Sequence, residues 1–516
     1  MKLALSSLIS EIDKYAAEVI GMPLIDLMGR SGAAVEGAVR SYVKDGSFVV
    51  ILAGCGNNGG DGYAAAVRLM KDFRVKVFDV FSKGQRTDEG RHFLELFKSM
   101  DGEVEDLTLS AEQKNEIKNA ACIVDAVFGT GFRGEIPDTV KELATVVSEA
   151  VGAKKIAIDV PMGVNADDGS VDISTASVHA TVELSYIKPG IVSYPARSFV
   201  GRIIYDDLGL PKDRIEKQFD FKYRLIDEEY AKKHLPRRDD NSNKGTFGKT
   251  LLITGSERFR GAGRLTLEAA LRGGVGLVAY AGAEKLTEEY SREFPEAIYK
   301  SFDIDGGDNA DELIALSSQY SSLLIGSGSG NTPEVAKLTE ALLASEGGPL
   351  ILDADAINSI AAERENALVL IKNAKRPVIL TPHPLEFARL SGHDVATVQR
   401  KRLATAIRFA AENRCILVLK GAGTIVTNGK DVYINTSGSS ALAKAGSGDV
   451  LAGFIAALSA YVEEPIVAAA LGVYYHGAAG DSLARELSTY GVTPSDLPRE
   501  IARMIAKTQG RASEKR

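Results

Sequence analysis

The chain has 516 residues, which is too long for one ordinary hydrophobic core, so we expect two or three domains. A composition of 45% hydrophobic and 25% charged residues is that of a folded protein and excludes a disordered or fibrous one. The formal net charge of -8 excludes a broad polyanion-binding surface, so nucleic acid is not an expected partner.

The cysteines are few and widely separated. Cys55, Cys122 and Cys415 form no CxxC pair, so the sequence indicates neither a disulfide framework nor a zinc site. This usage fits a reducing compartment, and we expect a cytoplasmic protein.

The N-terminal segment MKLALSSLISEIDKYAAEVIG is predicted to be an amphipathic helix. Its short apolar stretch is interrupted by Glu11, Asp13 and Lys14, which argues against a signal peptide. The most apolar region, residues 466–480, is shorter than a bilayer requires. We therefore expect no membrane span and no membrane partner.

From residue 47 onward, short β-branched runs alternate with amphipathic helical stretches. The strand-like runs SFVVILAG and VKVFDVF alternate with the helical YAAAVRLMKDF and RHFLELFKSM, which predicts βαβ units and a parallel sheet. Two later strands, ACIVDAVFG and KKIAIDVPMG, carry Asp125 and Asp159 at their carboxyl ends. Such strand ends face the ligand crevice in open α/β sheets.

The texture becomes charged and nonperiodic near residues 212–224, before a new strand, KTLLITG. The α/β alternation then resumes with YSSLLIGSGSG, GPLILDADAIN, RPVILTPHP and CILVLKGAGTIVTNG. We therefore predict an α/β chain whose first domain, residues 1–213, is a Rossmann-like three-layer sandwich and whose second α/β domain covers residues 222–510.

A glycine-rich loop, GCGNNGGDG at residues 54–62, lies between a predicted strand and a predicted helix. Such a loop alone is equally consistent with a sharp turn and with a phosphate site at the helix N-terminus. Asn57, Asn58 and Asp61 add oxygens that can ligate a hard cation or orient a ligand, which a pure turn would not need. A single strand-end aspartate such as Asp125 or Asp159 is often only a helix cap.

Four ordered motifs in the first domain, GCGNNGGDG, DAVFGTGFRGE, IDVPMGVNADDG and the YIKPG around Lys188, resemble those of the NAD(P)HX epimerase domain. The resemblance implies that Asp159 is the acid/base at the hydrated ring carbon and that Asn58 and Asp125 coordinate a potassium ion. It also implies two loops that hold the substrate phosphates and ribose: Asn57, Asn58, Gly59, Gly60 and Asp61 in the first, and Gly129, Thr130, Gly131, Phe132, Arg133, Gly134 and Glu135 in the second.

Met162 departs from this family pattern, which usually has Ser in the turn after Asp159. The ion site is then expected to be weaker or to use a backbone carbonyl at Met162. The alternative for this domain is a fold that binds without catalysing, as in the related domain of the enhancer-of-decapping scaffold.

In the second domain, AGSGD leads directly into an apolar helix. The small residues 445–448 would expose backbone amides to phosphoryl oxygens at the helix N-terminus, with Asp449 beside them. A carboxylate there can accept the proton of an attacking hydroxyl. On this string alone, a helix cap and a general base are equally supported for Asp449.

AGSGD together with KGTFGKTLLITGS, GSGSG, LDADAIN, TPHPLEFARL and LKGAGTIV resembles the ribokinase-like superfamily and, within it, the ADP- or ATP-dependent NAD(P)HX dehydratase. The resemblance implies that Asp449 activates the 6-hydroxyl of the hydrate and that Gly448 touches the nucleotide. It places the nucleotide phosphates at Lys420, Gly421, Ala422, Gly423 and Thr424, and the substrate at Ala262, Gly328 and His383.

Three features of this domain remain open in the sequence. His383 between Pro382 and Pro384 also fits a fixed extended turn. Asp353 and Asp355 fit substrate binding, a metal link or a turn and cap device. Residues 437–445 depart from the commoner family pattern, which has an Asn and further glycines there.

Together the resemblances imply a cofactor-repair enzyme whose substrates are NAD(P)H hydrates. The second domain would phosphorylate the 6-hydroxyl, because phosphate leaves more readily than water, and the first would interconvert the R and S epimers. The expected cofactors are ADP or ATP, a potassium ion and a magnesium ion, and the expected assembly is a homo-oligomer. The alternative is a vitamin-precursor kinase with a non-catalytic nucleotide-binding N-terminal module, although GNNGGDG and TPHP are not expected in such kinases.

Overall fold

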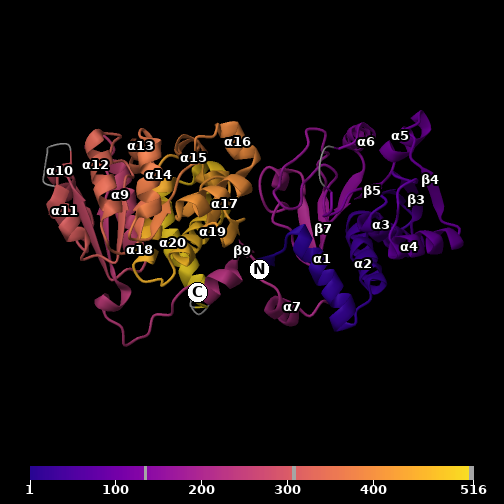
Figure 1. Ribbon diagram of the computed structural model, residues 1–516, viewed down its shortest axis with the longest axis horizontal. Coiled ribbons are helices and arrows are strands. Elements are labelled where there is room, and N and C mark those ends of the chain that lie inside the picture. The colour runs from indigo at the N-terminus through magenta and orange to yellow at the C-terminus, as the bar shows by residue number, and fades with distance from the viewer. Residues whose placement is uncertain (133–135, 305–309, 511–516) are drawn as a thin grey trace. The chain divides into compact units, whose positions relative to one another are not determined.

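A computed structural model describes residues 1–132, 136–304 and 310–510. The chain divides into two compact units, Lys2–Tyr223 and Arg224–Arg516. Helix α7 (Lys212–Gln218) belongs to the first unit, because Ile215 is buried in that unit's core. Each unit has a sheet with helices around it, so the predicted α/β class is confirmed (Figure 1).

The first unit follows the predicted alternation of strands and helices. Its elements in chain order are β1 (Lys2–Leu3), α1 (Ser6–Tyr15), a π-helical turn (Ala16–Ile20), α2 (Leu24–Tyr42), β2 (Phe48–Ala53), α3 (Asn57–Leu69), β3 (Arg74–Asp79), α4 (Asp88–Ser99), β4 (Glu103–Asp106), α5 (Ala111–Lys118), β5 (Cys122–Ala126), α6 (Asp138–Glu149), β6 (Lys154–Ile158), β7 (Ala180–Leu184), β8 (Arg202–Asp206) and α7.

The sheet of the first unit has the order β4-β3-β2-β5-β6-β7-β8, and its neighbouring strands pair in parallel. Alternate residues of a strand enter two different cores, as the two-residue period of a strand requires. Val49 and Ile51 of β2 pack with α1, α2 and α3, whereas Val50 and Leu52 pack with α5 and α6. The result is the predicted three-layer sandwich, with strand carboxyl ends gathered at one edge.

The second unit contains the following elements. They are β9 (Tyr223–Ile226), α8 (Glu228–His234), β10 (Lys249–Ile253), α9 (Arg260–Arg272), β11 (Leu277–Gly282), α10 (Glu284–Glu293), β12 (Ile298–Ser301), α11 (Ala310–Ser317), β13 (Ser322–Ile325), α12 (Pro333–Ala344), β14 (Leu350–Leu352), α13 (Ala354–Ala361), α14 (Arg364–Asn373), β15 (Val378–Leu380), α15 (Pro384–Ser391), α16 (Val395–Arg400), α17 (Arg402–Asn413), β16 (Ile416–Leu419), β17 (Ile425–Thr427), β18 (Val432–Asn435), α18 (Ser447–Ser459), α19 (Pro465–Gly491) and α20 (Leu497–Thr508).

Its sheet runs in the order β9-β18-β17-β16-β15-β14-β13-β10-β11-β12. The strands from β12 to β16 pair in parallel, and β17 and β18 add an antiparallel extension. One face packs against α9, α18, α19 and α20.

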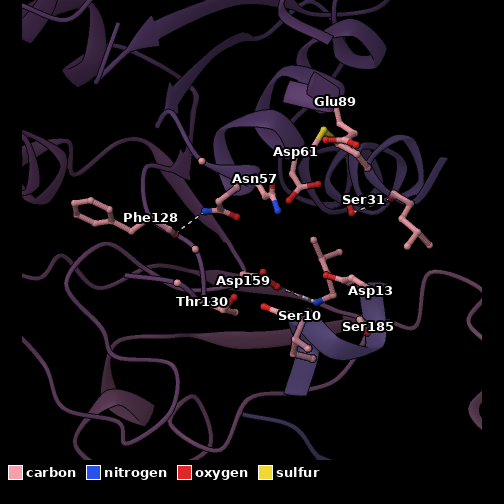
Figure 2. A pocket seen from close by; sticks show the side chains of 18 of the residues that line it. Ser10, Asp13, Ser31, Asn57, Asp61, Glu89, Phe128, Thr130, Asp159 and Ser185 are labelled. Carbon is pink, nitrogen blue, oxygen red and sulfur yellow. Dashed lines mark hydrogen bonds between the residues drawn. The ribbon is translucent and has the colours of Figure 1, made fainter. Parts of the chain in front are cut away.

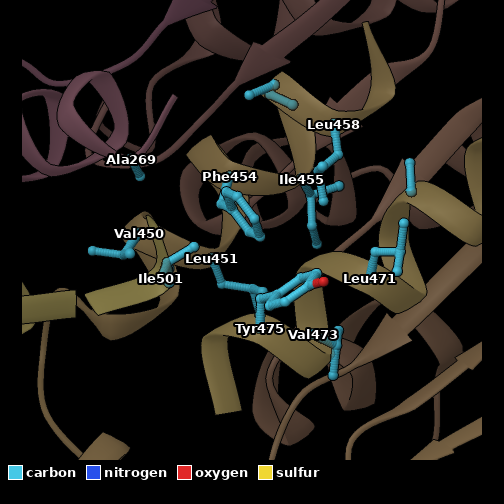
Figure 3. Close-up of a cluster of buried hydrophobic side chains, with 14 of the residues drawn as sticks. Ala269, Val450, Leu451, Phe454, Ile455, Leu458, Leu471, Val473, Tyr475 and Ile501 are labelled. Carbon is cyan, nitrogen blue, oxygen red and sulfur yellow. The ribbon is translucent and has the colours of Figure 1, made fainter. Parts of the chain in front are cut away.

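Helix α18 lies at the centre of that core. Phe454 packs edge-on against Tyr475 of α19, and Leu451 and Ile455 fill the space around them (Figure 3). A helix that is apolar on nearly all sides is stable only when it is buried in this way. The rigid surroundings fix the N-terminus of α18, where the predicted AGSGD site lies.

Among the described residues, every helix falls short of the length or the apolar character needed to cross a bilayer. The apolar stretch at residues 466–480 is instead part of α19, which packs into the core of the second unit.

Candidate active sites

A cavity of about 390 Å³ opens at the carboxyl ends of the strands in the first unit (Figure 2). It brings together residues that the sequence predicted from separate motifs: Asn57, Asn58, Asp61, Gly129, Thr130, Gly131, Phe132 and Asp159. The predicted Arg133, Gly134 and Glu135 lie outside the described residues.

The glycine loop is shaped by close backbone contacts. A Cβ atom on Gly54 would lie 2.0 Å from the Val127 carbonyl oxygen, and one on Gly59 would lie 1.9 Å from that of Gly54. Only glycine fits at either position. Gly59 and Gly60 therefore lie beneath the loop and do not line the cavity, whereas Asn57 and Asn58 begin α3 beside it.

Asn58, which lines the cavity, and Asp125 are both buried. The Asn58 amide nitrogen donates to the Phe128 carbonyl at 2.6 Å, while its Oδ1 has no hydrogen-bond partner among the described residues. Asp125 accepts from the amides of Val127 and Met162, and burial raises its pKa to about 6. An unsatisfied buried amide oxygen such as Asn58 Oδ1 is unusual, and a cation would satisfy it.

Met162 reaches this region only through its backbone. Its amide donates to Asp125 Oδ2 at 2.7 Å, and its side chain packs in the apolar cluster with α6. Because the thioether packs among apolar side chains, a hard cation would use the backbone carbonyl of Met162. No group of three or more His, Cys, Asp and Glu side chains among the described residues is arranged to hold a metal.

Asp159 follows β6 directly and has a positive φ of 59°. Its Oδ1 accepts from Lys188 Nζ at 2.6 Å and from the Leu184 amide at 3.3 Å. Lys188 is fully buried and also lies 3.5 Å from Glu183 Oε2. Burial raises the pKa of Glu183 to about 8. Burial alone would lower the pKa of Lys188, but the charges of Asp159 and Glu183 hold it above its usual value.

In the second unit, Asp449 lies in the first turn of α18, whose N-cap is Gly446 with a φ of 100°. Asp449 does not cap this helix, so the cap interpretation is wrong: no side chain caps α18. The amides of Gly448 and Asp449 donate to no acceptor within the described part of the chain. Two unpaired amides at a helix start form an anion site.

The pKa of Asp449 is raised to about 7, first by burial and then by the charge of Asp353, while Lys420 acts in the opposite direction. Asp353 is itself buried and forms an ion pair with Lys420, whose Nζ lies 2.8 Å from Asp353 Oδ1. Thr381 and Ser327 each donate to Asp353 at 2.7 Å. Asp353 therefore orients Lys420 and makes no cap bond to α13, which excludes a simple cap for this residue.

The loop at residues 420–424 joins β16 to β17 and turns through two glycines, Gly421 and Gly423, with φ of 126° and 64°. The Thr424 hydroxyl donates back to the Gly421 carbonyl at 2.9 Å, while Ala422 is exposed. At its start, Lys420 Nζ lies 3.3 Å from the position of a Cβ on Gly448. The structure thus brings the predicted Lys420, Gly448 and Asp449 together.

His383 occupies the N-cap of α15, where its Nδ1 accepts from the amides of Leu385 and Glu386. Its Nε2 lies 3.0 Å from Glu386 Oε1, and the side chain is 45% exposed. The histidine is therefore fixed by local bonds, as the extended-turn interpretation expected, and keeps an exposed ring edge. Asp355 accepts from the Gly330 amide at 2.8 Å, and burial raises its pKa.

A second cavity, of about 670 Å³, lies at the carboxyl ends of β10, β11 and β13. Asp355, Gly330 and Phe259 line it, but Asp449 and Lys420 do not. Ala262 and Gly328 lie next to it in direct contact, since a Cβ on Gly328 would fall 2.5 Å from that of Ala262. The predicted substrate residues Ala262 and Gly328 are therefore neighbours at the edge of this cavity.

Two supporting residues of the second unit carried no sequence signal. Arg402 is buried and donates to the carbonyls of Leu419 and Lys420, which holds the 420–424 loop, and burial lowers its pKa to about 10. The buried His476 of α19 has its Nε2 3.0 Å from the Ser447 carbonyl, beneath the start of α18. Burial lowers the pKa of His476 to about 4, so the ring is neutral and Nε2 is the donor.

The fold and these sites define a two-domain α/β enzyme with one active site per unit. The profile of the NAD(P)H-hydrate dehydratase family matches residues 250–503, and the profile described as YjeF-related protein N-terminus matches residues 24–190. The bifunctional NAD(P)H-hydrate repair enzyme Nnr of Moorella thermoacetica is 34% identical, covering 96% of this chain and 95% of the relative. The Nnr of Escherichia coli is 31% identical, covering 96% of this chain and 92% of the relative.

The chain therefore belongs to the bifunctional NAD(P)H-hydrate repair enzymes, with an epimerase unit followed by a dehydratase unit. A ribokinase-like superfamily protein from Enterococcus faecalis, of known structure, matches the second unit with a TM-score of 0.50 and 27% identity. The match covers 56% of this chain and 98% of the Enterococcus faecalis chain, and it confirms the ribokinase-like fold. The vitamin-precursor kinase alternative is set aside.

Proposed function

We propose that Asp449 is the general base of the dehydratase unit and accepts the proton of the 6-hydroxyl of the S hydrate. The observation that carries this role is its position: a carboxyl group with a pKa near 7 stands beside two unpaired helix amides and the Lys420 ammonium. A base is most effective when its pKa lies near the working pH. The neighbouring amides would stabilise charge on the phosphoryl group that the hydroxyl attacks.

ADP or ATP would supply that phosphoryl group, which converts the hydroxyl into a better leaving group. Its phosphates would lie against Gly448 and the 420–424 loop, whose chain turns through two glycines without bulky side chains. A magnesium ion in such sites is held mainly by phosphate oxygens and one or two carboxylates. Asp353 and Asp355 are close enough to Asp449 to raise its pKa and would provide those carboxylates.

The hydrate itself would extend from Asp449 toward the 670 Å³ cavity, which has Ala262 and Gly328 at its edge, and the exposed ring of His383 would help to hold it. The close packing of Ala262 on Gly328 supports this role, because a larger side chain at either position would fill the edge of the cavity. Whether the substrate is the NADH or the NADPH hydrate depends on contacts with the ribose phosphate.

In the first unit, Asp159 would be the acid/base at the hydrated ring carbon, positioned by its ion pair with Lys188. Asn57, Asn58 and Asp61 and the loop 129–135, of which residues 129–132 are described, would hold the substrate phosphates and ribose. A potassium ion would take Asn58 Oδ1, Asp125 and the Met162 carbonyl. The unsatisfied Asn58 Oδ1 supports this site, since such a buried oxygen calls for a partner.

The three cysteines are free thiols, which supports our proposal of a reducing, cytoplasmic location. We also propose a homo-oligomer, which analytical ultracentrifugation would test.

The decisive assay for the whole proposal mixes the protein with purified hydrate, adds ADP or ATP, and follows the absorbance of NADPH. We expect the absorbance to recover only when the protein and the nucleotide are both present. A protein that consumes nucleotide but leaves the hydrate unchanged would contradict the dehydratase assignment.

A further inference from the structure

The epimerase cavity contains a carboxyl group that the roles above leave unused. Asp13 of α1 lines the cavity with Asp61 and Asp159, and Figure 2 shows the three side chains around the same open space. Ile9, Ser10 and Asp13 lie on one face of α1 by helical spacing, and that face forms part of the cavity wall.

Helix α1 is fixed to the segment that follows Asp159. The Ser6 amide and hydroxyl both donate to Asp167 Oδ1 at 2.7 Å, so a carboxylate from that segment holds the helix N-terminus. A π-helical turn follows Asp13 at residues Ala16–Ile20, and such turns occur often at functional sites. The position of Asp13 relative to Asp159 is thus set by direct contacts.

Asp13 differs from the other carboxyl groups in the cavity by its lack of partners. Asp159 is held by Lys188, and Asp61 is buried in α3 with a hydrogen bond from Ser31. The Asp13 carboxyl group makes no hydrogen bond or ion pair with the described residues and is half-buried, so it can reach a bound ligand. Its polar atoms are available for substrate.

Resting on the proposed role of Asp159, we propose that Asp13 is a second catalytic residue of the epimerase, a carboxylic acid that exchanges a proton with the ring nitrogen of the hydrate. The charged or titratable groups around it are Asp61 on α3, Asp159 after β6 and Lys188 after β7, and Glu89 on α4 and Cys55 also line the cavity. Burial and the charge of Asp159 raise the pKa of Asp13 to about 6, while Lys188 lowers it. Neighbouring carboxyl groups in such different surroundings divide the acid and base roles.

The hydrate carries its hydroxyl on C6, which is also bonded to ring nitrogen N1. Asp159 accepts the hydroxyl proton, the electrons of the O–H bond form a C6=O double bond, and the C6–N1 bond breaks with its electron pair moving to N1. Asp13 gives its proton to N1. After rotation about C5–C6, the same transfers in reverse close the ring with the opposite configuration and return both protons, so no co-reactant is consumed.

The test compares Asp13→Asn with Glu11→Gln, an exposed neighbour on the same helix whose substitution changes the net charge equally. The full-length chain is used, and the interconversion of R and S hydrates is followed by chromatography between pH 5 and 9. Dehydration of the S hydrate by the second unit is measured in the same samples as an internal control.

We expect Asp13→Asn to lower the epimerisation kcat by about 100-fold or more with KM little changed, as loss of a general acid predicts. Glu11→Gln and the dehydration rate stay at wild-type values. Because Asp13 must be protonated to act, wild-type kcat/KM falls as the pH rises through about 6, and this decline is absent in Asp13→Asn. Asp13→Glu, which restores an acid, recovers the decline and part of the rate.

A wild-type rate in Asp13→Asn, or the same pH decline, overturns the proposal. If Asp13→Asn unfolds the first unit, shown by thermal melting, Asp13→Glu decides alone, and a profile without the decline overturns it. Asp159→Asn distinguishes failure of the Asp13 proposal from failure of the proposed epimerase site. If Asp159→Asn is inactive and Asp13→Asn is fully active, only the role of Asp13 is rejected. If Asp159→Asn is fully active, the proposed epimerase site itself is rejected.

Discussion

The two units use a lysine beside a carboxylate in opposite ways. In the first unit, Lys188 binds the proposed catalytic residue itself, with Nζ 2.6 Å from Asp159 Oδ1. In the second, Lys420 binds Asp353 at 2.8 Å and leaves Asp449 with a pKa raised to about 7. In the first unit the lysine therefore pairs with the proposed catalytic carboxylate, whereas in the second it pairs with a neighbouring carboxylate, and burial raises the pKa of the proposed base.

Substitution of Asp449 should have the largest effect, and that effect should separate the activities of the two units. Asp449→Asn removes the proposed base, so the dehydration kcat should fall by about 1,000-fold. Epimerisation should be unchanged, because its carboxylates lie in the other unit. Both rates are measured on one preparation, with the exposed Glu346→Gln as the charge-matched control. Dehydration at more than a tenth of the wild-type rate would contradict the role of Asp449.

The lysine of the first unit offers the next largest effect. Lys188→Met leaves Glu183 and Asp159 without their buried cation, and removal of one partner from a buried pair typically lowers the free energy of unfolding by about 3–5 kcal/mol. Urea denaturation should show an earlier transition of the first unit with loss of epimerisation. The surface pair Lys141–Asp138 provides the control, since Lys141→Met should change stability little. Equal stability of both variants would show that the pair is not structural.

His476 tests how the anion site of the second unit is held. His476→Leu removes the donor to the Ser447 carbonyl, and loss of this buried hydrogen bond should lower the free energy of unfolding by about 1 kcal/mol. We expect a higher KM for the nucleotide with a smaller change in kcat, and partial recovery in His476→Gln, which can restore a donor. Equal nucleotide KM in wild type and His476→Leu would limit His476 to packing.

The smallest expected effect is a shift in pH dependence. Asp449 must be ionised to accept a proton, so dehydration kcat/KM should rise as the pH passes through about 7. Asp353→Asn removes the charge that raises the pKa of Asp449 and frees Lys420, so the rise should move to lower pH. An unmoved or upward-shifted profile would contradict the claim that the charge of Asp353 raises the pKa of Asp449.

The fold was predictable because it depends on local periodicity. The apolar runs at β2, β5 and β6 predicted strands with glycine or aspartate at their carboxyl ends, and the structure places those ends together. The role of Asp449 was not decidable from AGSGD, because cap and base differ only in which residue occupies the N-cap, and that residue is Gly446.

Other parts of the sites depend on contacts between distant segments. The sequence left Asp353 open between substrate binding, a metal link and a turn and cap device, because its partners are distant: Lys420 lies 67 positions away and Thr381 28 positions away. His476 and Ser447 are 29 residues apart, and no sequence spacing marks that contact. Arg402 likewise supports the 420–424 loop from a different helix. Such tertiary pairings set charge and orientation but leave no motif.

The most direct test of the account is a crystal structure of the full chain with ADP and magnesium. We predict that the nucleotide phosphates lie against the amides of Gly448 and Asp449, with the 420–424 loop beside them and the Asp449 carboxyl group facing the nucleotide. A nucleotide whose phosphates lie away from the start of α18, with Asp449 turned toward bulk solvent, would contradict it.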